Sequence, residues 1–330
     1  MIKRVSLGLA VASLFAVPAI SQSSASQQDN SNQPPAHTVA VPDLSSGKTR
    51  SERLKSFENA PQLQRGFEAK DLLEQRRRLD AALGAIQPQR PGLVDVYVVT
   101  VALDSDPVFA REAREAGRVL ARRYDANGRT LTLAGPDGTR DDLPRGSIDT
   151  LLVSLAAIAE KMDADEDVLV MYSTSHGIQM GLAYHYGDEG FGVLSPAKLA
   201  ETLDQLGIKR RVLILSACYS GVFIPALKSD DTAILTASAA TRTSFGCEAE
   251  NDWTFYGDAM INRALRKPQP LADAAQEAAR TVAGWEINQR LLASLPQSSI
   301  GSGVSDWLPA LEARMPQTAS APVGRPAVPE

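Results

Sequence analysis

The chain has 330 residues, with 34 lysines and arginines against 39 acidic residues and a formal net charge of −5. This length fits one or two domains, and a hydrophobic content of 44% is ordinary for a globular protein. The mildly acidic balance, without a long basic run, argues against nucleic acid as a partner.

The N-terminus has the pattern of a secretory signal peptide. Lys3 and Arg4 precede an apolar stretch over residues 5–20, and small residues follow, including Ala25. We therefore expect residues 1–25 to be a signal peptide and the protein to be secreted or periplasmic. The apolar stretch is short for a membrane span, which needs about twenty residues, so we expect no span after signal removal. An uncleaved anchor is the alternative.

Three further segments lie before or after the region at 91–310, which we expect to be the main folded domain. Residues 26–48 are rich in Ser, Gln, Asn and Pro, which predicts a disordered linker. Residues 49–90 combine many charges with spaced apolar positions and predict a helical extension of one or two helices, with a removable pro-segment as the alternative. Residues 311–330 are rich in Pro and Ala and predict a disordered tail.

Residues 91–310 alternate between strand and helix patterns. Strands are predicted at 94–102, 129–134, 168–172, 212–215 and 232–238, helices at 108–124, 148–162, 197–206, 254–266 and 271–290, and a hairpin excursion at 177–195. This alternation predicts an α/β fold with a mostly parallel sheet and helices on both faces. Arginines recur along the first of these helices and predict a solvated charged face; they are Arg111, Arg114, Arg118, Arg122 and Arg123.

A histidine and a cysteine follow two of the predicted strands. His176 comes after the strand at 168–172, and Cys218 comes after the strand at 212–215. Ligands bind at the carboxyl ends of the strands in open α/β sheets, so both side chains are expected at the edge where chemistry occurs. A histidine and a cysteine at the ends of neighbouring strands are typical of a cysteine nucleophile with a histidine base.

Glycines beside these two residues permit close approach of a substrate. The backbone N–H groups of Gly177 and Cys218 are therefore candidates for an oxyanion hole. The chain has only one other cysteine, Cys247, so a disulfide between Cys218 and Cys247 is the structural alternative for both. Asp188 and Glu189 lack further ligands at useful spacing, so neither a metal nor a cofactor is predicted.

Four short motifs resemble the legumain-type (C13) cysteine peptidases of the caspase-like clan. They are His176-Gly177, then Ala217-Cys218-Tyr219-Ser220-Gly221, then the stretch TAILTASAATRTSFGC at 232–247, and then Trp253-Thr254-Phe255-Tyr256-Gly257-Asp258. The segment at 109–133 is similar to bacterial members, so the chain resembles a secreted bacterial member of this family.

The resemblance implies a caspase-like sheet and hydrolysis of peptide bonds without a metal. Cys218 would be the nucleophile that forms a thioester, and His176 would be the general base and acid. Ser244 and Asp258 match positions that line the pocket for the substrate side chain before the scissile bond. The legumains themselves cleave after Asn, and an acidic residue in that pocket helps to recognise it. This chain has Ser216 at the acidic position, so the resemblance does not extend to specificity for Asn.

In this family an Asn near the end of the first strand assists the catalytic residues, and this Asn has no clear match in the present sequence. Asp104, Ser105 and Asp106 occupy the corresponding region.

A peptide or protein is the expected substrate. A transpeptidase or ligase of the same fold, in which an amine resolves the thioester, is one alternative. A catalytically silent caspase-like module that binds a partner is another. The sequence does not indicate an oligomeric state.

Overall fold

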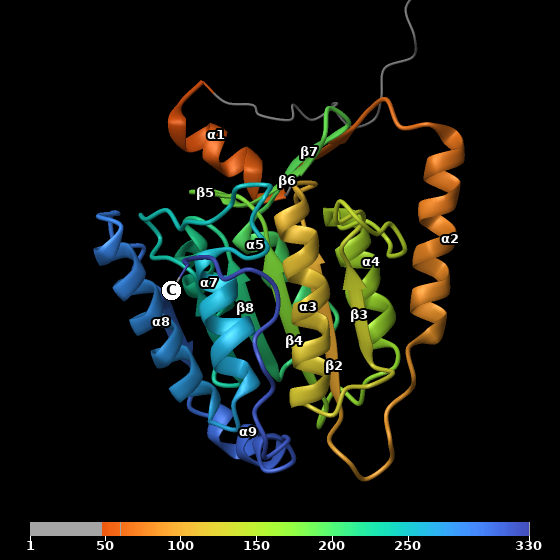
Figure 1. Cartoon of the computed structure of the whole chain (residues 1–330). Coiled ribbons are helices and arrows are strands. Elements are labelled where there is room, and N and C mark those ends of the chain that lie inside the picture. The colour runs from red at the N-terminus through yellow and green to blue at the C-terminus, as the bar shows by residue number, and fades with distance from the viewer. Residues whose placement is uncertain (1–47, 60, 330) are drawn as a thin grey trace, which may run out of the picture. The chain divides into compact units, whose positions relative to one another are not determined.

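The computed structural model describes residues 48–59 and 61–329 (Figure 1). The predicted signal peptide and all of the predicted linker except Lys48 lie outside the described residues. Among the described helices, none is long and apolar enough to cross a membrane.

A six-stranded sheet forms the centre of the structure, in the spatial order β10-β9-β8-β4-β2-β3. Its strands are β2 (Val96–Ala102), β3 (Thr130–Leu133), β4 (Val168–Thr174), β8 (Arg211–Ser216), β9 (Thr232–Thr236) and β10 (Gln297–Ile300). All neighbours pair in parallel except β10, which pairs antiparallel with β9. The predicted α/β fold with a mostly parallel sheet is therefore confirmed.

The apolar strands are buried because helices cover both faces of the sheet. Every residue of β2, β4, β8 and β9 is buried. Along β2, Val96 and Val98 belong to one hydrophobic cluster, whereas Tyr97 and Val99 belong to another. Successive side chains of a strand point to opposite faces, so each face has its own core.

Different helices supply the two cores. The first core contains residues of α3 (Pro107–Arg123), α7 (Phe255–Gly257), η3 (Asp258–Arg263), η4 (Ala264–Arg266), α8 (Leu271–Asn288) and α9 (Val304–Glu312). The second contains residues of α2 (Ala69–Ala85), α4 (Ile148–Ala159), α5 (Pro196–Gln205), η2 (Ser220–Phe223) and α6 (Ile224–Leu227).

A second, antiparallel sheet has the order β1-β7-β6-β5. The predicted excursion after His176 forms β5 (Gly177–Ile178), β6 (Gly181–Tyr186) and β7 (Gly190–Leu194). The N-terminal extension adds β1 (Gln62–Gln64), which pairs with β7. The extension thus reaches the excursion that begins beside His176.

The N-terminal extension is mainly helical, as predicted. Its first helix, α1 (Arg50–Ser56), begins with a capping box in which Thr49 and Glu52 exchange side-chain and backbone hydrogen bonds. A short 3₁₀ turn, η1 (Phe57–Asn59), then precedes β1, and α2 follows.

The prediction of a fully solvated arginine face on α3 is wrong. Arg114 and Arg123 are buried. Arg114 forms an ion pair with Asp137 at 3.1 Å, and Arg123 donates to the backbone carbonyl of Gln269 at 2.6 Å. The packed loops around α3 supply these partners, which offset part of the cost of burying a guanidinium group.

The C-terminal segment also differs from the predicted disorder. The helix α9 extends to Glu312, into the predicted tail. Beyond it, Val323 accepts a hydrogen bond from the Trp253 indole at 2.9 Å, and the N–H of Ala327 donates to Asp258 at 2.9 Å. Hydrogen bonds from several backbone groups thus hold this Pro-rich segment against the body of the domain.

Candidate active site

His176 and Cys218 leave neighbouring strands in matching register. β4 and β8 pair in parallel, with Thr174 opposite Ser216 at their carboxyl ends. His176 and Cys218 each lie two residues beyond this pair. The structure therefore brings the two predicted catalytic residues to one edge of the sheet.

Gly177 places the backbone after His176 directly against Cys218. A Cβ atom at Gly177 would lie 1.9 Å from the carbonyl oxygen of Cys218, far inside van der Waals contact. Only a glycine fits this approach. The two predicted oxyanion donors, Gly177 and Cys218, thus belong to backbone segments in contact.

The sulfur of Cys218 lies against Ser244. The N–H of Ser244 donates to Sγ at 3.2 Å, and Sγ is 3.6 Å from the carbonyl oxygen and 3.7 Å from Oγ of the same residue. Cys218 is half-buried, which leaves part of the residue open to solvent.

The turn after Cys218 is strained. Tyr219 adopts a left-handed conformation with φ 58°, which a non-glycine residue adopts at a cost. Its N–H donates to the carbonyl of Arg242 at 2.8 Å, and this bond helps to hold the turn. A four-residue 3₁₀ turn, η2, begins at Ser220. The chain therefore reverses sharply just after Cys218.

Phe109 supports the His176 ring from α3. The two rings pack edge-to-face with centroids 5.1 Å apart. Nε2 of His176 is 4.0 Å from Oδ2 of Asp106, which is too long for a hydrogen bond, and both side chains are 46% exposed. This pair is therefore screened by solvent.

The three predicted pocket residues have different surroundings. Ser244 lies at the sulfur of Cys218. Ser216 is buried, and its Oγ is 3.1 Å from Oγ1 of Thr254. Asp258 is fully buried, and it accepts hydrogen bonds from the Asn262 amide and from the backbone of Ala327. Their role in substrate binding stays a prediction.

Glu112 is a buried residue beneath the site that the sequence analysis missed. Its Oε1 accepts hydrogen bonds from the Tyr172 hydroxyl and from Oγ1 of Thr174 at 2.7 Å, and its Oε2 accepts from the N–H of Thr254 at 2.8 Å. Burial raises the pKa of the Glu112 carboxyl, and these donors partly oppose the shift. Glu112 therefore ties α3 to β4 and to the segment that contacts Ser216.

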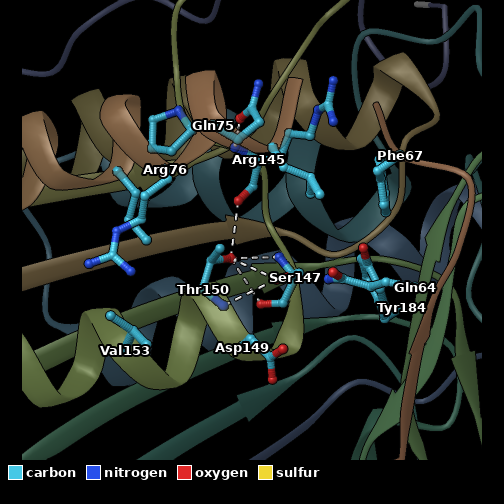
Figure 2. Close-up of a pocket in the computed structure, with 13 residues that line it drawn as sticks. Gln64, Phe67, Gln75, Arg76, Arg145, Ser147, Asp149, Thr150, Val153 and Tyr184 are labelled. Atoms are coloured by element: carbon cyan, nitrogen blue, oxygen red, sulfur yellow. Dashed lines mark hydrogen bonds between the residues drawn. The ribbon is translucent and has the colours of Figure 1, made fainter. Parts of the chain in front are cut away.

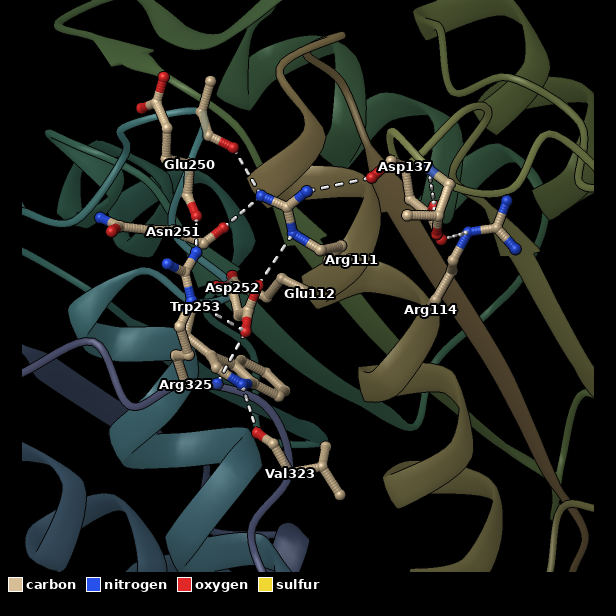
Figure 3. Close-up of polar contacts among 12 residues, drawn as sticks. Arg111, Glu112, Arg114, Asp137, Glu250, Asn251, Asp252, Trp253, Val323 and Arg325 are labelled. Atoms are coloured by element: carbon tan, nitrogen blue, oxygen red, sulfur yellow. Dashed lines mark hydrogen bonds and ion pairs between the residues drawn. The ribbon is translucent and has the colours of Figure 1, made fainter.

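Polar contacts hold the 239–254 loop, which carries Ser244, against α3. Figure 3 shows the Arg111 guanidinium between two segments, where it donates to the carbonyls of Asp137 at 3.0 Å and of Ala249 at 2.5 Å. Arg111 also lies 3.4 Å from Asp252, which accepts the N–H of Arg325 from the C-terminal segment. The loop is thus held by Arg111 of α3 and by Arg325 of the C-terminal segment.

Cys247 lies in the same loop but differs from Cys218 in its environment. Both cysteines are free in the structure, so no disulfide joins them. Cys247 packs against the cluster that contains Phe109 and Ala113. Burial raises the pKa of the Cys247 thiol, and the neighbouring Cys218 and Glu112 add to the shift. Cys247 is therefore poorly suited to act as a thiolate.

The described residues contain no group of three or more His, Cys, Asp or Glu side chains that could hold a metal ion. A cavity of about 260 Å³ lies between α2 and α4 (Figure 2). None of the predicted site residues lines it; its walls include Phe67, Leu79, Arg145, Val153 and Tyr184.

Comparisons with known proteins agree with the resemblance seen in the sequence. Residues 155–306, which include His176, Cys218, Ser244 and Asp258, match the model of the Peptidase C13 family. The resemblance to C13 peptidases is therefore confirmed over this segment, and the match supports a cysteine peptidase-type function. No curated protein matches the chain.

Among solved structures, the chain is similar to caspase-1 from Spodoptera frugiperda. The sequence identity is 12%, the TM-score is 0.41, and the match covers 66% of this chain and 93% of that chain. No conclusion about function follows from a likeness at this level.

Proposed function

Starting from the match of residues 155–306 to the Peptidase C13 family, we propose that the protein is a cysteine-type endopeptidase with Cys218 as nucleophile and His176 as general base and acid. The observation that carries the proposal is the contact of Gly177 with the carbonyl of Cys218. It brings together the two turns that carry the imidazole and the thiol.

The first step is ionisation of the thiol. An ordinary cysteine thiol titrates near pH 8.5 and is only a few per cent thiolate at neutral pH. His176 accepts the thiol proton, and the N–H of Ser244 stabilises the thiolate through its contact with Sγ. The result is a thiolate beside an imidazolium.

The thiolate then attacks the carbonyl carbon of the scissile peptide bond. A C–S bond forms, and the oxygen of the tetrahedral intermediate carries the charge, stabilised by the backbone N–H groups of Gly177 and Cys218. His176 gives its proton to the departing amine as the C–N bond breaks. Water, deprotonated by His176, hydrolyses the thioester and releases a carboxylate and the free thiol.

The substrate side chain before the scissile bond would bind beside Ser244 and above the buried Ser216 and Asp258. Ser216 is neutral where the family carries an acid, and Asp258 already accepts hydrogen bonds from Asn262, Arg263 and the backbone of Ala327. We therefore propose a peptide substrate without assigning a preferred residue.

The test is hydrolysis of a mixed peptide library by the purified protein, with mass spectrometry of the products. We expect cleavage by the wild type and a loss of at least ~10³-fold in Cys218→Ser and in His176→Ala. Cys247→Ser is the matched control and should keep most of the activity, because that thiol does not take part. Hydrolysis that persists in Cys218→Ser would refute the assignment.

Two alternatives are outcomes of the same experiment. Products that carry an added amine in place of water would indicate a transpeptidase. A wild-type protein that cleaves nothing, and whose Cys218 reacts no faster than Cys247 with a thiol-reactive probe, would indicate a silent binding module.

A further inference from the structure

A segment at 323–328, which we call the strap, lies against the end of the 239–254 loop. Figure 3 shows Val323 and Arg325 of the strap beside Trp253 and Asp252 of the loop. The strap forms neither a helix nor a strand, and much of it is exposed: Val323 is 42% exposed and the Arg325 side chain 71%. Its partly buried apolar residues are Ala327 and Val328. Apolar burial therefore explains little of its placement.

Three buried side chains bind the backbone of the strap. The Asn262 amide pairs with both backbone groups of Val323, donating to the carbonyl at 3.1 Å and accepting the N–H at 2.9 Å. The Trp253 indole donates to the same carbonyl at 2.9 Å. Oδ2 of Asp258 accepts the N–H of Ala327 at 2.9 Å. None of these three side chains is more than 2% exposed.

These contacts make a site that recognises peptide backbone. Asn262 offers one donor and one acceptor to a single residue, as the backbone of a neighbouring strand does. Buried polar groups need hydrogen-bond partners, and the strap supplies them for the amide, the indole and the carboxylate. The bound segment and the buried side chains therefore satisfy one another.

The strap also joins two elements of the domain. Asp258 and Asn262 belong to η3, whereas the loop contributes Trp253 and Asp252. The N–H of Arg325 donates to Asp252 at 2.7 Å, and its guanidinium donates to the carbonyl of a second loop residue, Glu250. The strap thus fastens the end of the loop to η3.

A tight turn makes both attachments possible. Gly324 adopts φ 72°, a left-handed conformation that glycine takes without strain. The turn lets the strap present Val323 to η3 and Arg325 to the loop.

The fastened end of the loop is connected to the segment beside Cys218. The Asn251 side chain donates to the carbonyl of Gly246 at 3.2 Å, and the N–H of Phe255 donates to the carbonyl of Phe245 at 3.0 Å. Phe245 directly follows Ser244, whose N–H contacts the sulfur of Cys218. Order at the strap therefore extends to the proposed nucleophile.

We propose that Trp253, Asp258 and Asn262 form an intramolecular peptide-binding site, and that the strap bound there keeps the 239–254 loop in the conformation that contacts Cys218. The consequence for turnover rests on the proposed peptidase function, whereas the ordering of the loop does not. The strap is exposed and held mainly by hydrogen bonds, so it detaches by a local opening that leaves the core folded.

Release of the strap leaves the loop with its contacts to Arg111 of α3. The loop then samples other conformations, and a substrate must select the ordered one. The apparent affinity for the substrate falls by the fraction of molecules in which the loop is ordered.

Hydrogen exchange of the full chain, followed by mass spectrometry, tests the ordering. Ala327→Pro removes the N–H that Asp258 accepts. We expect amides of both the strap and the 239–254 loop to exchange about tenfold faster than in the wild type. Ala321→Pro is the matched control, because the N–H of Ala321 makes no hydrogen bond within residues 48–59 and 61–329, and it should change loop exchange by less than about twofold.

Two results would overturn the proposal. One is faster exchange in the strap with no change in the loop, which would separate the two. The other is exchange that Ala327→Pro leaves unchanged in both, which would show that the carboxylate of Asp258 does not hold the strap. If Ala327→Pro does not fold, Val323→Pro decides the matter by removing the N–H that Asn262 accepts, with an expected acceleration of about fivefold in the loop.

A free peptide distinguishes recognition of the strap from a general loss of stability. A synthetic peptide with the sequence of residues 316–330, at a few mM to match the effective concentration of a tethered segment, should return loop exchange in Ala327→Pro towards the wild-type rate. The same peptide carrying Ala327→Pro should not. Equal effects of the two peptides, or no effect of either, would refute a site that binds this segment.

The active enzyme gives a separate readout. In Ala327→Pro we expect KM for a peptide substrate to rise about threefold with kcat little changed, because substrate binding must then order the loop. A merely structural loss of folded enzyme would lower kcat at unchanged KM. Absence of hydrolysis in the wild type would refute the proposed function but leave the exchange result valid, so the two failures are distinguishable.

Discussion

Two buried carboxylates lie close to the proposed active site, and they differ in how well they are satisfied. Glu112 is fully buried, and both of its oxygens accept hydrogen bonds, from Tyr172, Thr174 and Thr254. Asp104 is almost as buried, but one of its oxygens faces His185 without a hydrogen bond in the described part of the chain. A satisfied carboxylate braces the fold through its hydrogen bonds, whereas the buried Oδ2 of Asp104 contributes no such bond.

The position of Glu112 explains why its bonds matter to the site. Thr174 lies two residues before His176 on β4. Thr254 contacts Ser216, which lies two residues before Cys218. Glu112 therefore holds, from beneath, the strand ends from which both proposed catalytic residues emerge.

Removal of the Glu112 side chain should give the largest effect on stability. Glu112→Ala leaves two hydroxyls and one N–H buried without partners and opens a cavity, so we expect a loss of about 4 kcal/mol in the free energy of unfolding. Urea denaturation measures it. Glu201→Ala, at an exposed ion pair with Lys198, is the control and should change stability by less than about 0.5 kcal/mol. A small loss in Glu112→Ala would mean that the carboxyl does not brace the strand ends.

The pH dependence of stability gives the next largest effect. The pKa of Glu112 is raised in the folded state, so the folded protein holds this proton more tightly than the unfolded chain does. The stability contributed by the group is present below the unfolded pKa of about 4.3 and is lost as pH rises through the folded pKa. Asp104, whose pKa is also raised, contributes with the same sign.

Glu112→Gln isolates this contribution, because the amide keeps one acceptor and adds donors for the hydroxyls. We expect the stability of the variant, relative to wild type, to increase with pH above about 4.3, by at most about 1.4 kcal/mol per pH unit. Urea denaturation at pH 4 to 8 measures the difference. Asp137 contributes to the pH dependence with the opposite sign, since its pKa in the folded state is lowered to about 2. This residue is present in both the wild type and Glu112→Gln, so its contribution cancels in the difference between them. A difference that is constant across this range would show that Glu112 has a similar pKa in both states.

The sequence predicted the sheet well because its strands are continuous apolar runs, and it predicted His176 and Cys218 because each follows such a run. It did not predict β1 or β10, since QLQ and QSSI are short and largely polar. These strands form only because an open sheet edge is present to pair with them. Pairing of this kind depends on tertiary structure and leaves no hydrophobic period in the sequence.

The buried charges of α3 escaped prediction for a related reason. Glu112 and Arg114 alternate with alanines and other arginines, a pattern that also fits a solvated helix face. Only the packing of β4 and the 239–254 loop against α3 reveals which charges are inside. The contact of Asp104 with His185 was hidden likewise, because the two residues are 81 positions apart in the chain and meet only through the bridge between β6 and the segment after β2.

The smallest effect on stability should come from Asp104→Asn, and it has the opposite sign to that of Glu112→Ala. Asn keeps the shape and the oxygen that accepts the Asp106 N–H, and it removes a buried charge whose second oxygen has no hydrogen bond within the described ranges. We expect the free energy of unfolding at pH 7 to stay the same or to rise by up to about 1 kcal/mol. Calorimetry of the variant beside wild type and Asp106→Asn measures it. A loss of several kcal/mol would show that Asp104, like Glu112, is held by its bonds, and would remove the contrast between the two carboxylates.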